Sequence, residues 1–285
     1  MSEQSDWSVL KMLEWATHYF SEKQVPSPRL SIEWLLADVL NIKRLELYLQ
    51  FDRPLTLVEL SRLREFVKRR AAHEPLQYIT GSTSFYNAGI NVRSGVLIPR
   101  PETEEMVEMI ISESMADNVT LLDIGTGSGC IPIAVKMERP KWHVTGCDIS
   151  TVALDIAKEN GAINGVDVSF VEADLLKIET MPEKYWDIIV SNPPYIGYEE
   201  KDELEQQVKD YEPEIALFTE NRNKVYSSII SYAQTHLNSS GLLYLELHYE
   251  HKIEDENLLN PEVWDYEIRL DSAKKRRVLK AVYKS

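Results

Sequence analysis

Cysteine is nearly absent from this chain, which has two, Cys130 and Cys147, among 285 residues. Two cysteines cannot form the disulfide framework of a small secreted protein, and their spacing matches no zinc site. We expect both to be reduced packing residues, in the first helix and the second strand of the larger of two domains.

Long apolar runs are also missing, since no stretch approaches the roughly 20 residues that a helix needs to cross a bilayer. Residues 1–6 have neither the basic start nor the apolar segment of a secretory signal. These absences predict a cytoplasmic protein with no membrane partner.

Positive charge is scarce as well. The chain has 31 lysine and arginine residues against 46 aspartate and glutamate residues, a net charge of −15. This charge repels the phosphate backbone of nucleic acid, so we expect no direct nucleic-acid substrate. A nucleic-acid partner would need a local basic patch, and two basic clusters are candidates, although solvated faces or helix-end charges are the favoured interpretation of each. They are Arg62, Arg64, Lys68, Arg69 and Arg70, and Lys274, Lys275, Arg276 and Arg277.

Two domains are expected from the length of the chain. Residues 1–80 have a helical period, clearest over residues 32–40, and no strand period. Thr56 and Glu59 form a capping-box pair, and the helix that they begin should end before Pro75. The sequence therefore predicts a small helical bundle at residues 1–80.

The remainder of the chain predicts a linker and an α/β domain. Residues 81–100 are rich in glycine and β-prone residues, which indicates a linker with a β-hairpin. Pro101 fits the first position of a helix. Over residues 101–285 apolar strands alternate with helices, which predicts a doubly wound, Rossmann-like sheet. The expected strands are 120–124, 143–148, 168–172, 187–190 and 242–247, with a final hairpin of two edge strands at 266–270 and 278–283.

A glycine loop, DIGTGSG, runs from Asp123 after the first of these strands. Glycines at this point allow a sharp turn and a close approach to a ligand. A dinucleotide fingerprint would have its third glycine at Cys130, so this spacing instead resembles class I S-adenosylmethionine (SAM) methyltransferases. A tight turn without a ligand is the alternative. The expected SAM-binding residues here are Gly125, Thr126, Gly127, Ser128 and Gly129.

Acidic residues follow the next two strands. Asp148 lies about twenty residues beyond the loop, where a carboxylate can accept hydrogen bonds from both ribose hydroxyls. Asp174, after the third strand, can accept from the exocyclic amine of adenine, with Leu175 against the ring. Asp174 fits a helix or turn cap equally well.

The run SNPPY at residues 191–195 follows the fourth strand. Proline fixes its own φ and restricts the residue before it, so the Asn192 amide and nearby carbonyls form a nearly fixed array. We hypothesise that Asn192 Oδ1 and the Pro193 carbonyl accept both hydrogens of a substrate nitrogen beside the SAM methyl group. Tyr195 would stack on the substrate. These acceptors strengthen as the nitrogen attacks, so this step needs no separate general base.

The predicted roles at this corner overlap. Asn192, Pro193 and Tyr195 are the predicted catalytic residues. Pro194 joins them in substrate binding, and Asn192 also contacts SAM. The corner is expected at the switch point between the first and fourth strands, where ligands of such sheets collect.

A metal site has a weaker basis. Glu246, His248, Glu250 and His251 have suitable donor atoms but no metal signature. We expect solvated residues at a strand end, and no metal.

Four motifs together resemble one family. They are residues 192–195, the glycine loop from Asp123, the run LIPRPETE at residues 97–104 and the run PLQYITG at residues 75–81. This combination resembles the PrmC/HemK family, the peptide chain release factor N(5)-glutamine methyltransferases, over most of the chain. The run at residues 97–104, with a helical amino-terminal domain, is its most specific part.

The resemblance implies methyl transfer from SAM to the glutamine of the Gly-Gly-Gln loop in class 1 release factors, which are then the protein partners. It also implies that the helical domain, residues 1–80, recognises this substrate. Residues 218–221, His248 and Lys274 depart from glycines usual in the family. These departures concern the outer loops and the partner surface.

Two alternatives remain open. An amino-methyltransferase acting on adenine or guanine of nucleic acid would use the same tetrapeptide, with Tyr195 stacking on a flipped base, at an electrostatic cost. A non-catalytic SAM- or dinucleotide-binding module would need the glycine loop but not the asparagine corner.

Overall fold

The computed structural model describes residues 4–114, 116–253 and 256–284. The chain forms two compact units, Met1–Gly81 with Glu205–Tyr211, and Ser82–Leu204 with Glu212–Ser285. We call them the helical unit and the sheet unit, respectively. The sequence places residues 205–211 in the methyltransferase domain, whereas in the structure they pack with the helical unit.

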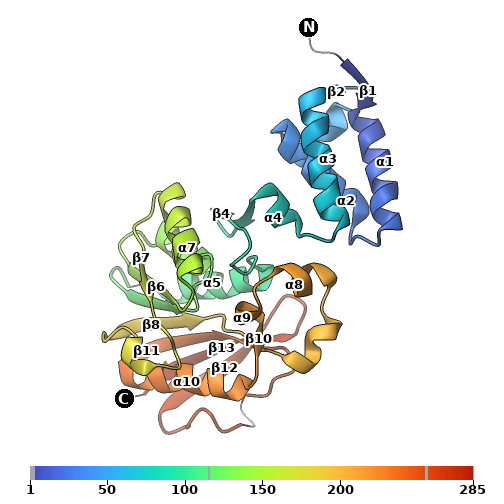
Figure 1. The fold of residues 1–285 in the computed structure, drawn as a ribbon. Coiled ribbons are helices and arrows are strands. Elements are labelled where there is room, and N and C mark those ends of the chain that lie inside the picture. Colours follow the sequence, from blue (N-terminus) through green and yellow to red (C-terminus); the bar gives the residue numbers. More distant parts are fainter. Residues whose placement is uncertain (1–3, 115, 254–255, 285) are drawn as a thin grey trace. The chain divides into compact units, whose positions relative to one another are not determined.

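The helical unit has helices packed around one apolar core (Figure 1). Ile32, Leu35 and Leu36 form its predicted buried stripe. Thr56 Oγ1 accepts from Glu59 N at 3.2 Å and the Glu59 carboxylate accepts from Thr56 N at 2.8 Å, so the predicted capping box is present. The helices are α1 (Val9–Glu22), α2 (Pro28–Leu40), a 3-10 helix (Arg44–Leu49), α3 (Leu57–Ala71), α4 (Leu76–Thr80) and, from the later segment, α8 (Gln206–Tyr211).

A small sheet in the helical unit contradicts the expectation that residues 1–80 contain no strand. β1 (Gln4–Ser8) pairs antiparallel with β2 (Pro54–Thr56). β2 has three residues, which is too short for an alternating pattern to be detected. Pairing between distant segments, rather than a local period, forms these strands.

The basic cluster on α3 does not form a continuous cationic face. Arg70 is 2% exposed and donates to Ser31 Oγ at 3.1 Å and to Gln207 Oε1 of α8 at 2.8 Å. Burial lowers the pKa of the Arg70 guanidinium to about 10. Two further pairs on this helix are Arg62 with Asp38 and Arg69 with Glu74. This internal pairing weakens one of the two candidate nucleic-acid surfaces.

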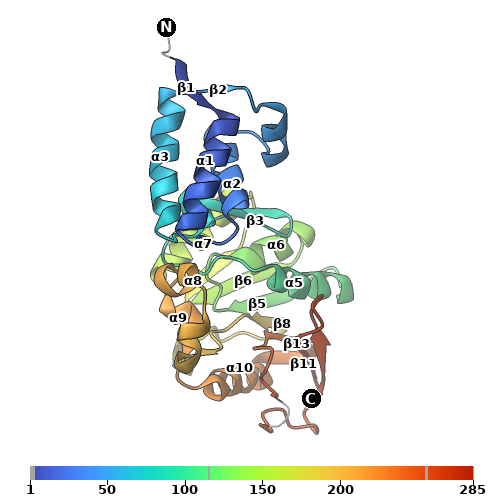
Figure 2. The ribbon, with the colours of Figure 1, turned by 90° about the vertical axis from the view of Figure 1, so that its right-hand side faces the viewer.

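A seven-stranded sheet forms the centre of the sheet unit (Figures 1 and 2), in the order β12-β13-β11-β8-β5-β6-β7. The strands are β5 (Thr120–Ile124), β6 (His143–Asp148), β7 (Ser169–Glu172), β8 (Trp186–Ser191), β11 (Leu237–Glu246), β12 (Trp264–Leu270) and β13 (Arg276–Tyr283). A hairpin of β3 (Ser82–Phe85) and β4 (Ala88–Asn91) precedes the sheet, as residues 81–100 predict. A separate short pair joins β9 (Ile196–Gly197) and β10 (Phe218–Thr219).

Helices cover both faces of the sheet, which confirms the predicted doubly wound fold. α5 (Pro101–Glu113), α6 (Cys130–Glu138) and α7 (Thr151–Ile163) lie on one side and α10 (Arg222–His236) on the other (Figure 2). Pro101 begins α5, as predicted. Cys130 and Cys147 are buried free thiols, also as predicted. Shorter helical segments are Ile178–Thr180, Tyr198–Glu203 and α9 (Glu214–Leu217).

The final hairpin is present, but the expectation of two edge strands was wrong for one of them. β13 pairs antiparallel with both β11 and β12, so only β12 lies at the edge. Val278, Leu279 and Ala281 of β13 are fully buried, which suits a strand covered on both faces and flanked on both sides. Among the described residues, no helix combines the length and apolar character needed to cross a membrane.

Candidate active site

The carboxyl ends of β5 and β8 lie side by side, because the two strands are parallel neighbours. Ile124 is paired with Ser191, whose hydroxyl donates to the Ile124 carbonyl at 2.7 Å. In the sheet, β6 and β7 lie beyond β5, and β11 and β13 lie beyond β8. This is the switch point where ligands bind in such sheets, and it brings the glycine loop beside Asn192 as predicted.

The three loop glycines have left-handed backbone conformations. The φ angles of Gly125, Gly127 and Gly129 are +75°, +54° and +78°, values that glycine adopts without strain. A Cβ added at Gly125 or Gly127 would meet nothing within 4 Å, whereas at Gly129 it would lie 3.0 Å from Ala157 Cβ. Gly129 therefore allows the loop to pack on α7, while Gly125 and Gly127 leave space for a ligand to approach the backbone.

Asp123, within β5, is a buried carboxylate that the sequence did not predict as a site residue. Among the described residues, no hydrogen bond of normal geometry reaches its oxygens, nor the hydroxyl oxygens of Thr126 and Ser128. Burial raises the pKa of Asp123 to about 7; the nearby Thr126 hydroxyl lowers this pKa, and the Asp148 charge raises it. Unpaired buried polar groups often mark functional sites. Together with the open glycines, these groups fit a polar ligand such as SAM. The one sequence feature that could have predicted Asp123 as a site residue is an acidic residue within an apolar strand.

Asp148 connects the glycine loop to the start of α7. Its Oδ2 accepts from Gly127 N at 2.8 Å, and its Oδ1 accepts from Ser150 N at 2.9 Å. Burial raises the pKa of Asp148, while these backbone hydrogen bonds lower it. Each carboxylate oxygen can accept a second hydrogen bond, so the geometry is compatible with ribose binding, which stays a prediction.

Asp174 and Leu175 follow β7. Asp174 Oδ1 accepts from Leu176 N at 2.9 Å, and its Oδ2 lies 3.3 Å from Lys177 Nζ. The turn-cap interpretation of Asp174 is therefore correct, and its contact with adenine stays a prediction. Leu175 is partly buried against the main core of the sheet unit, so only part of its side chain can face a ligand.

Asn192 is held by a chain of hydrogen bonds. Its Nδ2 donates to Thr103 Oγ1 at 3.2 Å, and the Thr103 hydroxyl donates to Glu246 Oε2 at 2.6 Å. Thr103 is 3% exposed and Glu246 is 1% exposed. Residues of α5 and β11 thus fix the amide of Asn192, which directly follows β8. Its Oδ1 takes no part in this chain and can accept from a substrate, as the hypothesis requires.

Tyr195 is bound to the other oxygen of the same carboxylate. Its hydroxyl donates to Glu246 Oε1 at 3.1 Å, and burial raises the pKa of Tyr195, so the hydroxyl stays protonated. Its ring packs against the main core and lies 5.9 Å from the His248 ring. Stacking of Tyr195 on a substrate stays a prediction. Pro193 is buried, whereas Asn192, Pro194 and Tyr195 are half-buried, so the corner is only partly accessible.

The expectation of solvated residues at the end of β11 was wrong for three of the four. Glu246, His248 and His251 are 1%, 7% and 9% exposed, and only Glu250 is exposed. β11 lies between β8 and β13, which encloses its carboxyl end. His248 Nε2 lies 3.1 Å from Glu200 Oε2. Within the described part of the chain, no group of three potential ligands could hold a metal ion.

Glu212 anchors the run at residues 97–104. This carboxylate is 5% exposed, and it accepts from Ile98 N at 3.1 Å and from Arg100 Nη2 at 2.6 Å. Both contacts lie just before α5, whose first turn contains Thr103. Two motifs far apart in the sequence therefore position the helix that holds Asn192.

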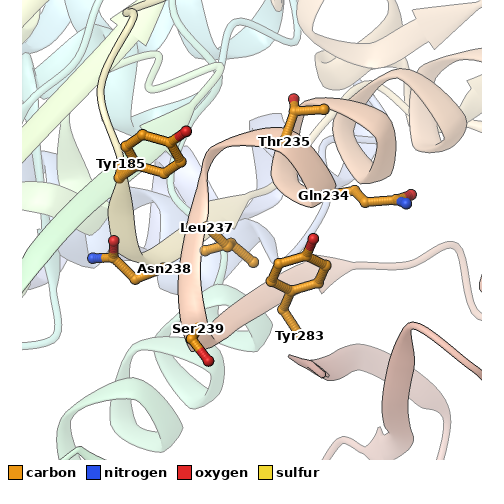
Figure 3. Close-up of a pocket in the computed structure, with 7 residues that line it drawn as sticks. All are labelled: Tyr185, Gln234, Thr235, Leu237, Asn238, Ser239 and Tyr283. Atoms are coloured by element: carbon orange, nitrogen blue, oxygen red, sulfur yellow. The ribbon is translucent and has the colours of Figure 1, made fainter. Parts of the chain in front are cut away.

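An open pocket of about 540 Å³ lies at the opposite end of the strands from this site, where β8 and β11 begin and β13 ends (Figure 3). Its lining residues are Tyr185, Gln234, Thr235, Leu237, Asn238, Ser239 and Tyr283. The lining includes none of the predicted site residues. This pocket is separate from the candidate active site.

Two family models match the chain, the PrmC N-terminal domain over residues 11–81 and the methyltransferase small domain over residues 103–209. A release factor glutamine methyltransferase from Chlorobaculum tepidum is 40% identical over 289 residues, 98% of either chain. One from Leptospira interrogans is 41% identical over 245 residues, 84% of this chain and 85% of its own. This chain belongs to the release factor glutamine methyltransferase family.

Solved structures agree with the methyltransferase fold of this family. A methyltransferase from Pyrococcus furiosus has a TM-score of 0.54 at 16% identity, over 79% of this chain and 98% of its own. A protein solved with S-adenosylhomocysteine (SAH) has a TM-score of 0.51 at 14% identity, over 68% of this chain and 53% of its own. At these identities the likeness concerns the fold alone. Membership of the release factor glutamine methyltransferase family confirms the predicted enzyme class and supports SAM as the cofactor.

Proposed function

We propose that the chain transfers a methyl group from SAM to the side-chain amide nitrogen of the glutamine in the Gly-Gly-Gln loop of a class 1 release factor. The orientation of Asn192 carries this proposal, since Nδ2 donates to Thr103 at 3.2 Å and Oδ1 is directed away from that bond. The names of relatives that are 40% and 41% identical support this acceptor.

The acceptor geometry suits a primary amide. Its nitrogen has two hydrogens, which match Asn192 Oδ1 and the Pro193 carbonyl, and the prolines fix the backbone before the substrate binds. Bound SAM supplies a methyl group on a positively charged sulfur. As the amide nitrogen forms its bond to carbon, its hydrogens become more acidic and both acceptors bind them more strongly. The bond between the methyl carbon and sulfur would break as the new bond forms, SAH would leave as a neutral thioether, and the nitrogen would lose one of these hydrogens as a proton to water.

The cofactor side is proposed from the same edge of the sheet. Gly125, Thr126, Gly127, Ser128 and Gly129 would hold the methionine part, with the open space at Gly125 and Gly127 in support. Asp148 would accept from the ribose, and Asp174 and Leu175 would contact adenine. Asn192 would contact both SAM and the acceptor, and Tyr195 and Pro194 would enclose the glutamine side chain.

The helical unit is the proposed docking domain for the release factor. The match to the PrmC N-terminal domain over residues 11–81 supports this role, as do the exposed rings of Trp15, Trp34 and Tyr48. The acidic net charge suits a protein partner better than nucleic acid. Residues 81–100 are then the linker to the methyltransferase domain at residues 101–285. A cytoplasmic location, where release factors act, follows from the same proposal.

Label transfer tests the proposed function. The chain is incubated with methyl-labelled SAM and a release factor whose loop glutamine is either present or replaced by alanine. We expect label only on the glutamine form, and mass spectrometry of the loop peptide should place it on the side-chain nitrogen. Label that persists on the alanine form would reject the proposed acceptor. Label on ribosomal RNA in the same reaction would favour the nucleic-acid alternative.

A further inference from the structure

The Glu246 carboxylate is linked to both ends of the Asn192–Tyr195 corner, directly to Tyr195 and through Thr103 to Asn192. One oxygen accepts from Thr103, which in turn binds the Asn192 amide, and the other accepts from the Tyr195 hydroxyl. A buried carboxylate of this kind is expensive to keep in the core unless its oxygens are bonded. Neither Thr103 nor Glu246 is among the residues placed against SAM or the acceptor.

The number of hydrogens on Thr103 determines which way the Asn192 amide faces. A threonine hydroxyl has one hydrogen, and an ionised carboxylate can only accept, so that hydrogen must go to Glu246. The Thr103 oxygen is then an acceptor toward Asn192, which has to present its NH2 group. A reversed Asn192 amide would place two oxygens against each other with no hydrogen between them.

We propose that Glu246, acting through Thr103, is a positioning residue that keeps Asn192 Oδ1 directed at the substrate nitrogen. The inference rests on the proposed function, because it takes Asn192 Oδ1 as the acceptor for that nitrogen. It goes further by identifying what sets the orientation of the amide. Both residues act at a distance from the reacting atoms, since Thr103 lies between Glu246 and Asn192.

Protonation of Glu246 would remove this constraint. A carboxylic acid at Glu246 can donate to Thr103, whose own hydrogen is then available to Asn192 Oδ1, so either amide orientation becomes possible. Burial raises the pKa of Glu246, while Thr103, Arg277 and Tyr195 lower it and Glu102 raises it. The other ionisable groups coupled to this carboxylate are Cys130 of α6 and Tyr226 of α10. Activity should therefore be lost as the pH falls through this pKa.

The pair Thr103→Val and Thr103→Ser tests the relay, because valine keeps nearly the same volume while serine removes only the methyl group. Valine removes the hydroxyl and serine keeps it. We expect Thr103→Val to lower kcat about tenfold to a hundredfold, the size of effect that follows from misplacing a reacting group. KM for the release factor and Kd for SAM should change little, and Thr103→Ser should retain most activity. A normal kcat in Thr103→Val would overturn the proposal.

A double-mutant cycle with Asn192→Ala separates positioning from a general structural effect. If Thr103 acts through Asn192, then Thr103→Val should cause no further loss in the Asn192→Ala background. Independent, multiplying losses would overturn the relay and leave the proposed function standing. Near-normal turnover by Asn192→Ala alone would instead contradict the acceptor geometry of the proposed function.

Glu246→Gln provides a second readout that does not depend on Thr103 variants. The wild type should lose kcat toward acidic pH, and Glu246→Gln should have a lower kcat at pH 8 with that acidic limb absent. SAM binding by calorimetry checks that the variant is folded. An acidic limb that is unchanged in Glu246→Gln would overturn the assignment of this residue.

Discussion

The cofactor side and the acceptor side of the active site differ in how their buried polar atoms are hydrogen-bonded. On the cofactor side, Asp123, Thr126 and Ser128 have buried oxygen atoms with no hydrogen-bond partner among the described residues. On the acceptor side, Tyr195 bonds directly to one buried carboxylate, and Asn192 is connected to it through Thr103. The hydrogen bonds concerned are 2.6 to 3.2 Å long. The acceptor side is therefore preorganised before any ligand binds, whereas the cofactor side has polar atoms that can still form hydrogen bonds to a ligand.

This difference separates stability from catalysis. Each unpaired buried polar group costs about 1–3 kcal/mol, so the cofactor side lowers the stability of the free protein. Preorganised acceptors instead lower the barrier, because they need no rearrangement when charge develops. Variants on the cofactor side should therefore change stability and SAM affinity, and variants on the acceptor side should change turnover.

Asn192→Ala should have the largest effect. It removes one of two fixed acceptors, and we expect kcat to fall about thirtyfold to a thousandfold, or about 2 to 4 kcal/mol of transition-state stabilisation. Single-turnover methylation of a release factor measures this loss, and calorimetry should show SAM binding retained. Asn238→Ala, at the opposite end of the strands, where β11 begins, is the matched control and should keep normal turnover. Equal losses of kcat in the two variants would show that the effect is not specific to the active-site end of the strands.

Asp123→Asn should alter the pH dependence of stability. The folded-state pKa of about 7 lies above 3.8, the ordinary pKa of an aspartate in an unfolded chain, so the folded protein binds the proton more tightly. The resulting stability is fully present below the unfolded pKa and is lost as pH rises toward 7. Relative to the variant, the wild type should lose about 2 kcal/mol between pH 5 and 7, measured by urea unfolding. Parallel pH profiles for the two proteins would contradict the unpaired state of Asp123.

Asp148→Asn should weaken SAM binding about tenfold, because a neutral amide accepts weaker hydrogen bonds than a carboxylate. Calorimetry measures this, and kcat at saturating SAM should stay within a few-fold of the wild type. Asp187→Asn is the control, since Asp187 accepts from Thr120 and Asn238 at the opposite edge. It should lower stability without changing SAM affinity, and unchanged affinity in Asp148→Asn would reject the ribose assignment.

The smallest expected effect is the difference in stability between alanine variants at two positions of the glycine loop, Gly127 and Gly129. Alanine at Gly127 or Gly129 brings a similar strain from positive φ. Gly129→Ala adds overpacking against Ala157, so its free energy of unfolding should be lower by about a further 1 kcal/mol. Gly127→Ala should have the larger effect on SAM affinity. The opposite ranking in urea unfolding would show that Gly127, not Gly129, is the packing glycine.

Local patterns predicted much of the fold. β5 and β6 begin and end at the predicted residues because buried parallel strands are short apolar runs between turn residues. The capping box of α3 is likewise a local signal. β1 and β2 were missed because their pairing is not local. The attachment of α8 to the helical unit was missed because it depends on the contact between Arg70 and Gln207, 137 residues apart.

The same distinction applies to the site. The glycine loop and Asn192 were predictable, because each is a motif whose residue types have a local reason. Thr103 was visible only as part of a run, and Glu246 was taken for a solvated residue. Their roles depend on contacts across 89 and 143 residues, which no period or spacing in the sequence reveals.

The most direct test of the central claim is a crystal structure of the chain with SAH and a Gly-Gly-Gln peptide. Asn192 Oδ1 and the Pro193 carbonyl should each lie about 2.7–3.2 Å from the glutamine side-chain nitrogen, with Nδ2 of Asn192 still bound to Thr103. A glutamine nitrogen bound elsewhere, or an Asn192 amide that faces it with NH2, would contradict the account.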